Sequence, residues 1–487
     1  MAPARGPWQV GVPPRRSRAA LLSAVVRDCL GAVARIAPAA ARATGVAIGI
    51  AIAIGSALGA GLACVPQRAD WLSEKTVDTL VSRAVRARGL SPAGPLRVRR
   101  LAPGEVRRHL ADEFDRLVTP AELARDEALK HALGLLPPGA DLREAILAFQ
   151  TGTVVGFYAP LDRALHVVGD GARRAPLAPE AETVVVHEIV HALQDQHTGL
   201  LDVTLGLLDH DDLAFALGAL LEGDATWAGF RDEATESGHP PPSAEAFRAE
   251  MAHFDAESRA LRAPRLLRDL FLLQYPAGYA LVEELVERGG VAALDDALFD
   301  PPLSSQEVLH PERYLEGRRL LAMPALDGGA FVPDAACEEL TRNTFGELGL
   351  RVFAAEAGVG DAEAAAAAAG WRADRAVLLD CPGGRAFAWL VHFDDRVAAL
   401  AFLVQVRARP WQGVTEGLRA APRLDARGAR LLFSAGLEED GRRWLLESAE
   451  LVGFRDLTAY LTARPAILER ARRLRESAPP ATSDAEP

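Results

Sequence analysis

The sequence predicts a mainly helical α+β fold with a small C-terminal α/β unit. Residues 70–150 and 180–298 are expected to be largely helical, whereas β-rich runs are confined to a few short stretches. The chain has 487 residues, of which 49% are hydrophobic and 25% charged, which is ordinary for a globular protein and sufficient for a sizeable core. This length favours two or three domains or one large domain.

The region 70–150 is expected to contain helices around one short strand. Proline and glycine at 137–139 interrupt the helical pattern. The expected helices are Ala102–Leu117, Pro120–Leu135 and Asp141–Phe149, and the strand candidate is Leu96–Arg99.

The region 151–335 changes character at its start. Two β-rich runs, Thr153–Tyr158 and Ala164–Val168, flank a turn sequence at 159–163, so we expect a hairpin. Residues 180–298 follow as helices. Residues 299–335 are rich in proline and glycine and are expected to be irregular.

The C-terminal region, 336–470, is expected to begin with a helix at about 338–356. An alanine-rich run at 364–369 precedes the small α/β unit. The strand candidates of this unit are Ala376–Leu379, Ala386–Val391 and Ala429–Phe433. Residues 471–487 are expected to form a disordered polar tail.

The N-terminal segment is basic and precedes an apolar stretch. Residues 1–42 contain seven Arg and one Asp, whereas residues 43–67 carry no charge and are about as long as a membrane-spanning helix. The upstream Arg excess places the N-terminus inside the cell, so we expect the body to be extracytoplasmic. The stretch ends in GLAC at 61–64, which resembles a bacterial lipoprotein signal. An uncleaved anchor and a lipid on Cys64 are both left open, as is a buried helix.

Charge and cysteine content exclude some classes of function. The formal net charge is −12, and because residues 1–68 hold eight Arg and one Asp, the remaining chain carries about −19. Such an acidic body argues against a nucleic-acid partner. The four cysteines form no CxxC pair, which argues against a cysteine-ligated zinc site. Cys337 and Cys381 can form a disulfide in an oxidising compartment or stay as free thiols.

The main functional signal is the sequence HEIVH at 187–191. In a helix, His187 and His191 lie one turn apart on the same face, so both imidazoles can bind one zinc ion. Glu188 points slightly round the helix, where it can act as a general base on a zinc-bound water. This pattern predicts a zinc-dependent peptidase that acts on a peptide or protein substrate.

Zinc requires a third protein ligand, and two residues are candidates. Glu222 is favoured because its neighbours on a predicted helix are small, which lets a second helix approach; they are Gly218, Ala219, Ala225 and Thr226. His197 has the HExxHxxxxxH spacing of metzincins, but Gln194 stands where those proteins have the glycine that turns the chain. If Glu222 is the third ligand, His197 or Asp195 can instead form a hydrogen bond to one of the metal ligands without binding the metal itself. Asp224 can orient a histidine.

The HEIVHALQDQH sequence at 187–197, followed by LEGDAT at 221–226, resembles a group of bacterial zinc metallopeptidases of the gluzincin, or peptidase-MA-like, kind. Three further segments resemble that group: VGFY at 155–158, PPLSSQEVLHPERY at 301–314 and AAGWRADR at 368–375. The resemblance covers roughly 150–400. It implies a zincin-like metallopeptidase core, with His187, His191 and Glu222 as ligands and Glu188 as the catalytic base. The chain departs from the group's pattern at Ala159 and at 372–373.

Other residues can support catalysis. The hairpin at 153–168 is a candidate edge strand for an extended peptide. His310 is the first candidate for stabilising the oxyanion, ahead of Tyr275, Tyr279 and Tyr158. The alternatives to a gluzincin-like enzyme are a non-catalytic metal-binding envelope or assembly protein, and a metzincin-type site with His197. The metzincin type needs a methionine turn, which only Met251 or Met323 could supply.

Overall fold

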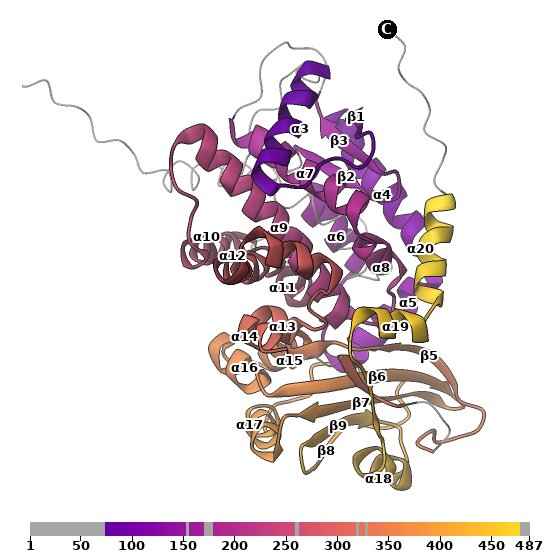
Figure 1. Cartoon of the computed structure of the whole chain (residues 1–487). Helices are drawn as coiled ribbons and strands as arrows, with labels where there is room; N and C mark the ends of the chain where they lie inside the picture. The colour runs from indigo at the N-terminus through magenta and orange to yellow at the C-terminus, as the bar shows by residue number, and fades with distance from the viewer. Residues whose placement is uncertain are drawn as a thin grey trace, which may run out of the picture.

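The computed structural model describes residues 74–151, 155–169, 179–258, 263–317, 321–326 and 330–477. Figure 1 shows a large helical part and, below it, a five-stranded sheet with its own helices. The expected membrane segment 43–67, including Cys64, lies outside the described residues. Among the residues that are described, no helix is both long enough and apolar enough to cross a membrane.

The helical part is built around α9 (Asp211–Ser237), which is buried over most of its length. The helices α3 (Glu74–Arg88), α7 (Pro179–His197) and α12 (Gln274–Phe299) pack directly on it. Further helices surround this centre: α4 (Val106–Leu117), α5 (Pro120–Leu133), α6 (Leu142–Thr151), α8 (Leu200–Gly206), α10 (Ala244–Ser258) and α11 (Arg265–Leu272). The sequence therefore predicted the helical character of this part correctly.

Glycines let α9 and α12 approach closely beside Glu222. A Cβ atom at Gly278 would lie 1.8 Å from the carbonyl oxygen of Ala219, and one at Gly223 would lie 2.2 Å from the carbonyl carbon of Gly278. Any larger side chain at either position would force the helices apart. The small residues near Glu222 were expected to admit the helix that carries the metal-binding histidines, whereas the close approach found here is to α12.

A three-stranded sheet lies against α7. Its strands are β1 (Arg97–Leu101), β2 (Gly156–Ala159) and β3 (Ala164–Val168), in the order β1-β3-β2. The strands β2 and β3 form the predicted antiparallel hairpin, and β1 joins it in parallel. Among the described residues, β1 and β2 are the two edge strands of this sheet, and all four residues of β2 are buried.

The C-terminal sheet has the order β5-β6-β7-β9-β8, and every neighbouring pair is antiparallel. The predicted α/β unit is therefore α+β, because its neighbouring strands are all antiparallel; hairpins join β6 to β7 and β8 to β9, whereas helices lie between β5 and β6 and between β7 and β8. The strands are β5 (Glu338–Asn343), β6 (Trp371–Cys381), β7 (Gly384–Phe393), β8 (Arg423–Arg427) and β9 (Arg430–Ala435). Its helices are α15 (Gly346–Glu356), α16 (Asp361–Ala368), α17 (Arg396–Val406) and α18 (Glu439–Glu447).

The expected helix at 338–356 was wrong in its first half. Residues 338–343 form β5, which pairs with β6, and the helix α15 begins only at Gly346. Asp374 on β6 fixes this change of direction, because its carboxylate accepts hydrogen bonds from the backbone N–H groups of Phe345 and Gly346 at 3.0 and 2.9 Å. Gly346 has φ +72°, a conformation that strongly favours glycine.

The region 299–335 contains more regular structure than expected. It holds the short helices α13 (Ser305–Leu309) and α14 (Pro311–Leu315) and the strand β4 (Leu321–Pro324). The strand β10 (Leu451–Phe454) returns from the C-terminal region to pair with β4. This pairing joins segments more than 100 residues apart, which local sequence patterns do not reveal.

The chain ends on helices that return to the helical part. The helices α19 (Leu457–Ala463) and α20 (Ala466–Glu476) follow β10, and α20 packs beside α8 (Figure 1). The disordered tail was expected from residue 471, but α20 continues to Glu476 because Ile467 and Ala471 are buried and Arg475 binds Asp195 at 2.7 Å. One hydrophobic core runs from Leu80 to Ala471.

A disulfide joins Cys337 and Cys381 in the C-terminal region. Of the two possibilities that the sequence left open for these cysteines, the structure has the bonded one. Trp371 and Trp389 are buried core residues, and both indole N–H groups donate to Asp374, at 3.0 and 2.8 Å.

Candidate metal centre

The helix α7 presents His187, Glu188 and His191 to the interior. Their exposed fractions are 6%, 0% and 3%. The two imidazoles lie one turn apart with their Nε2 atoms separated by 3.0 Å, and their rings meet at 81°. This is the placement that the four-residue spacing predicted.

Glu222 reaches this pair from α9. Its Oε2 lies 3.1 Å from Nε2 of His187 and 3.4 Å from Nε2 of His191, and the residue is only 1% exposed. Its other oxygen, Oε1, is buried with no hydrogen-bond partner among the described residues. Two imidazole nitrogens and a carboxylate oxygen thus converge within 4.8 Å of one another, which fits a transition-metal ion.

The electrostatics of the three groups are tightly linked. Burial opposes protonation of His191, but the Glu222 carboxylate outweighs it and raises the pKa of His191 to about 9. Burial also opposes ionisation of Glu222, yet the two histidines lower its pKa to about 2. The pKa of His187 is lowered by burial. A proton on His191 therefore balances Glu222, and a divalent ion would displace that proton on binding.

Gln194 fixes the tautomer of His191, a role that the sequence analysis missed. Its Nε2 donates to the Leu221 carbonyl at 3.0 Å and to Asp224 Oδ2 at 2.9 Å. Because both partners are acceptors, the Gln194 oxygen must face Nδ1 of His191, 2.8 Å away, and that nitrogen must carry a proton. The Nε2 lone pair is then available to a metal. A buried polar residue three positions after the second histidine was the available signal.

A buried ion pair supports this arrangement from the N-terminal region. Arg88, at the end of α3, is fully buried and pairs with Asp224, and its Nη1 lies 2.8 Å from Asp295 on α12. Asp224 in turn accepts the hydrogen bond from Gln194. The chain Arg88–Asp224–Gln194–His191 connects α3, α9 and α7, so residues 74–88 are part of the support of the site.

Glu188 lies beside the three groups and is held by the hairpin. The backbone N–H of Tyr158, on the edge strand β2, donates to Oε2 of Glu188 at 2.9 Å. Oε1 is buried and has no hydrogen-bond partner among the described residues. Burial raises the pKa of Glu188 well above its usual value. One oxygen is therefore fixed, and burial favours the neutral, protonated form of the carboxyl as long as no cation lies beside it.

The structure places His197 and Asp195 away from the metal-binding atoms. His197 is exposed, and its Nε2 lies 2.6 Å from the Ser91 carbonyl oxygen, because the helix simply continues past His191. Asp195 accepts a hydrogen bond from the Tyr158 hydroxyl at 2.7 Å and pairs with Arg475. The metzincin-type ligand set with His197 is therefore not assembled in this structure.

His310 does not join the site. Its Nε2 lies 3.0 Å from Glu347 on α15, and its segment is tied to the start of α9 by the hydrogen bond of Ser305 N to Asp212 at 2.8 Å. Asp212 precedes Glu222 by about 15 Å along the helix axis. The predicted catalytic role of His310 is therefore replaced by a structural one at the junction of the two parts.

Among the other oxyanion candidates, Tyr275 contacts one of the metal-binding groups. Its ring on α12 stacks against His187 with centroids 6.3 Å apart. The hydroxyl groups of Tyr279 and Tyr158 donate instead to the Pro242 carbonyl and to Asp195, at 2.8 and 2.7 Å.

Two of the segments that resemble the metallopeptidase group form the junction with the sheet. Gln306 donates to the Trp371 carbonyl at 2.6 Å, and Arg375 binds Asp209 at 2.8 Å. Comparisons of the chain with models of protein families, with curated proteins and with solved structures gave no match. The functional argument therefore depends on the geometry of the site.

Proposed function

We propose that this protein is a zinc-dependent peptidase of the gluzincin, zincin-like kind, which hydrolyses peptide bonds. One observation carries the proposal: His187, His191 and Glu222 converge from two helices, with the unpartnered oxygen of Glu188 beside them. Two imidazoles and one carboxylate are a ligand set of catalytic zinc sites, which keep the fourth position open. When bound, zinc supplies a Lewis acid that lowers the pKa of water and polarises a carbonyl group.

Glu188 is the proposed base. The Tyr158 N–H holds Oε2, so Oε1 is the atom that takes a proton from the attacking water and later returns it to the leaving amine. The ring of Tyr275 stacks on His187, so Tyr275 is the candidate proposed for contact with the oxyanion. Because Glu188 is 0% exposed, the surrounding chain must open before a peptide can bind.

The edge strand β2 is the proposed docking element for the substrate. It is one of the two edge strands of its sheet, and its Tyr158 backbone contacts Glu188 directly. A peptide that adds along this edge would bring its scissile bond near the base and the metal-binding groups.

We further propose that the body is extracytoplasmic and held to the membrane by residues 43–67, either as a helix or through lipid on Cys64. The Cys337–Cys381 disulfide supports an oxidising compartment, because such bonds are rare in the reducing cytosol.

The test compares the full-length protein, purified in detergent and dialysed against metal-free buffer, with its Glu188→Gln variant. Both are expected to retain zinc, and the variant is expected to lose peptidase activity on a mixed peptide library by a factor of about 100 or more. Glu182→Gln is the matched control, since Glu182 lies on the same helix but faces Arg83. Activity that survives in Glu188→Gln would overturn the assignment of the base.

A second candidate is a non-catalytic metal-binding envelope or assembly protein. The complete burial of Glu188 favours it, because a catalytic base has to meet its substrate. Bound zinc without peptidase activity in the wild-type protein, across substrates and pH, would support this alternative against the enzyme.

A further inference from the structure

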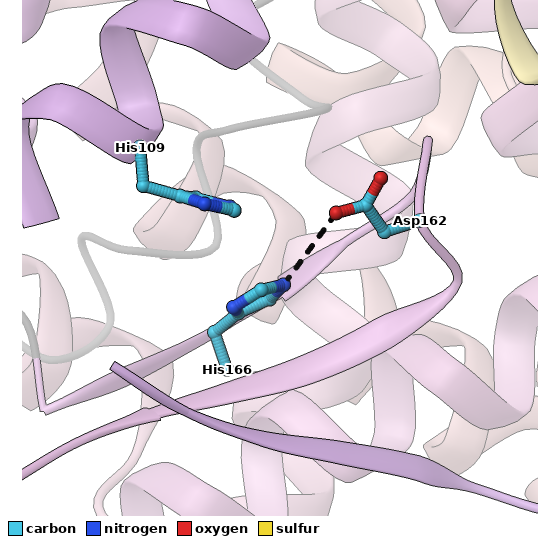
Figure 2. A group of neighbouring side chains, drawn as sticks. All are labelled: His109, Asp162 and His166. Atoms are coloured by element: carbon cyan, nitrogen blue, oxygen red, sulfur yellow. Dashed lines mark ion pairs between the residues drawn. The ribbon is translucent and has the colours of Figure 1, made fainter. Parts of the chain in front are cut away.

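A second cluster of metal-binding side chains lies on the other side of the hairpin. His109 comes from α4, Asp162 from the turn between β2 and β3, and His166 from β3 (Figure 2). One ligand atom from each residue lies within 4.8 Å of the others. The sequence analysis assigned no function to these residues, which are separated by up to 57 positions.

Three of the four ring nitrogens of this cluster are buried without a hydrogen-bond partner among the described residues. His166 is 3% exposed, and neither of its ring nitrogens is bonded; Nε2 of His109 is likewise buried and unbonded. A buried polar atom left in this state costs about 1–3 kcal/mol, so such groups normally have a partner. The unbonded nitrogens therefore indicate a ligand that both histidines share.

Ring packing explains the orientation of the imidazoles but not their nitrogens. His166 stacks on Phe157 with centroids 5.0 Å apart and an interplanar angle of 7°, and His109 lies 4.3 Å from His166. A purely structural stack would be served as well by phenyl rings, which have no nitrogen to satisfy. Stacking thus explains the contacts of the ring faces, but it does not provide partners for the ring nitrogens beside Asp162.

The spacing of the atoms suits an ion rather than a direct hydrogen bond. Nε2 of His166 and Oδ2 of Asp162 are 3.8 Å apart, which is too long for a hydrogen bond. Two ligands on one tetrahedral zinc ion lie roughly 3.4 Å apart, given metal–ligand distances of about 2.0–2.2 Å. A small movement of the side chains would therefore close the site around an ion.

Both oxygens of Asp162 have an arginine partner, but the contact with Oδ2 is long. Arg116 binds Oδ1 at 3.2 Å, while Arg99 donates to Oδ2 at 3.5 Å, and both arginines are partly exposed to solvent. Arg116 thus orients the carboxylate with Oδ2 toward His166, as the outer partner of a ligating carboxylate does. The two arginines oppose a cation at this place, so an additional negative group is needed.

Glu113 supplies that group. It lies one turn after His109 on the same helix, is fully buried, and neither carboxylate oxygen has a described hydrogen-bond partner. A buried carboxylate with no partner is rare in folded proteins. Burial and the charge of Asp162 raise the pKa of Glu113 to about 8, and a cation bound at the neighbouring histidines would favour its ionised form, which offsets the two arginines.

We propose that His109, Asp162 and His166, with Glu113 beside them, form a second metal site for a divalent ion of the zinc type. Two imidazoles with carboxylate oxygen favour zinc and its neighbours over calcium or magnesium, which prefer oxygen ligands alone. The ion joins α4 to the hairpin, whose strand β2 holds Glu188 through Tyr158. The site is therefore structural, and it exists whether or not the first site is catalytic.

The test counts bound zinc in the full-length chain and three variants, each loaded with zinc and dialysed against metal-free buffer. The expected contents are two zinc per chain for the wild type, one for His109→Gln, one for His191→Ala and none for the double variant. His131→Gln, another partly buried histidine on the adjacent helix, is the matched control and should retain both ions. If His109→Gln binds as much zinc as the wild type, the second site does not exist, whereas an unchanged content in His191→Ala would count against the first site alone.

A second measurement covers the case in which His109→Gln does not fold, as judged by circular dichroism. Asp162→Asn keeps the size of the side chain and removes its charge. Asp162→Asn is expected to bind one zinc fewer than the wild type. Zinc bound at the second site should still raise the Tm of His191→Ala, and Asp162→Asn should lose that contribution. A zinc-induced rise in Tm in the Asp162→Asn/His191→Ala variant equal to that in His191→Ala would overturn the proposal.

Discussion

The two histidine clusters offer the same types of ligand atom but differ in how their charges are balanced. In the first cluster, the pKa of His191 is raised to about 9 against the effect of burial, because Glu222 lies beside it. In the second, burial lowers the pKa of His166 to about 3, and arginines engage the nearby Asp162. The first cluster can be satisfied by a proton, whereas the second leaves neutral imidazoles with unbonded nitrogens.

The supports of the two clusters also differ. The first lies between α7 and α9, and a chain of buried side chains from Gln194 to Arg88 holds it. The second is formed by one helix, a turn and the strand β3, and ring stacking contributes to its packing. The first also has a carboxylate outside its ligand set, Glu188, with Oε2 held by the Tyr158 N–H and Oε1 without a hydrogen-bond partner among the described residues. The comparison indicates a reactive role for the first site and a structural role for the second.

The largest expected effect comes from removing the third ligand of the first site. Glu222→Ala is expected to lower the zinc content by one ion per chain, because two imidazoles alone hold zinc weakly. His197→Ala is the matched control and should retain the full content, since His197 is exposed and bonds the Ser91 carbonyl. Metal analysis after dialysis distinguishes them, and the opposite pattern would restore the metzincin-type ligand set.

A smaller effect is expected from Gln194→Leu. Without the Gln194 oxygen, the proton of His191 is no longer held on Nδ1, so zinc affinity should fall by roughly 10–100-fold. Gln196→Leu is the matched control, because Gln196 lies on the same helix but binds the backbone N–H of Ala93 at 2.8 Å. Competition with a zinc-binding dye measures the change. Equal zinc affinity in the two variants would show that the hydrogen bond from His191 to Gln194 does not contribute to zinc binding.

The sequence predicted those parts of the first site that depend on local spacing. The four-residue interval placed His187 and His191 together, and the small residues near Glu222 indicated the approach of a second helix, although the close approach found there is to α12. The tautomer of His191 could not be predicted, because it depends on Asp224 and on Leu221 of another helix. The second cluster also escaped prediction, since its residues belong to elements that meet only in the folded chain.

Errors in the predicted fold have the same origin. The strand β5 is polar and largely exposed, so its sequence carries little β signal, and pairing with β6 decides its conformation. The segment with His310 was interpreted as catalytic because Pro311 follows it. Its contacts with Glu347 and with the start of α9 instead connect the helical part to the C-terminal region. Long-range contacts fix both outcomes.

His210, a buried histidine outside the two clusters, tests whether a neutral buried imidazole by itself indicates a metal ligand. His210 caps α9, since its Nδ1 accepts a hydrogen bond from Leu213 N at 3.2 Å, and it packs against Tyr460. Burial lowers its pKa to about 3, assisted by the charge of Arg375 and Arg464 and opposed by Asp209. It has no carboxylate arranged for an ion and serves as the reference for the other two clusters.

The expected effect is on the acid side of the stability curve. In the unfolded chain His210 takes up a proton near pH 6.5, whereas in the folded chain it does so only near pH 3. Its contribution to stability is therefore complete above about pH 6.5 and is lost as the pH falls toward 3, by at most about 1.4 kcal/mol per pH unit. His210→Asn keeps a capping acceptor but does not titrate, so its stability should fall less steeply in this range.

Urea unfolding at several pH values between 3 and 7, in the presence of a chelator, measures this difference. The exposed His239→Asn should follow the wild type and provides the control. Parallel curves for His210→Asn and the wild type would mean that the buried imidazole takes up its proton at about the same pH in the folded and the unfolded chain. In that case a low pKa could not be inferred from burial alone, and the contrast between His166 and His191 would depend only on whether each cluster binds an ion.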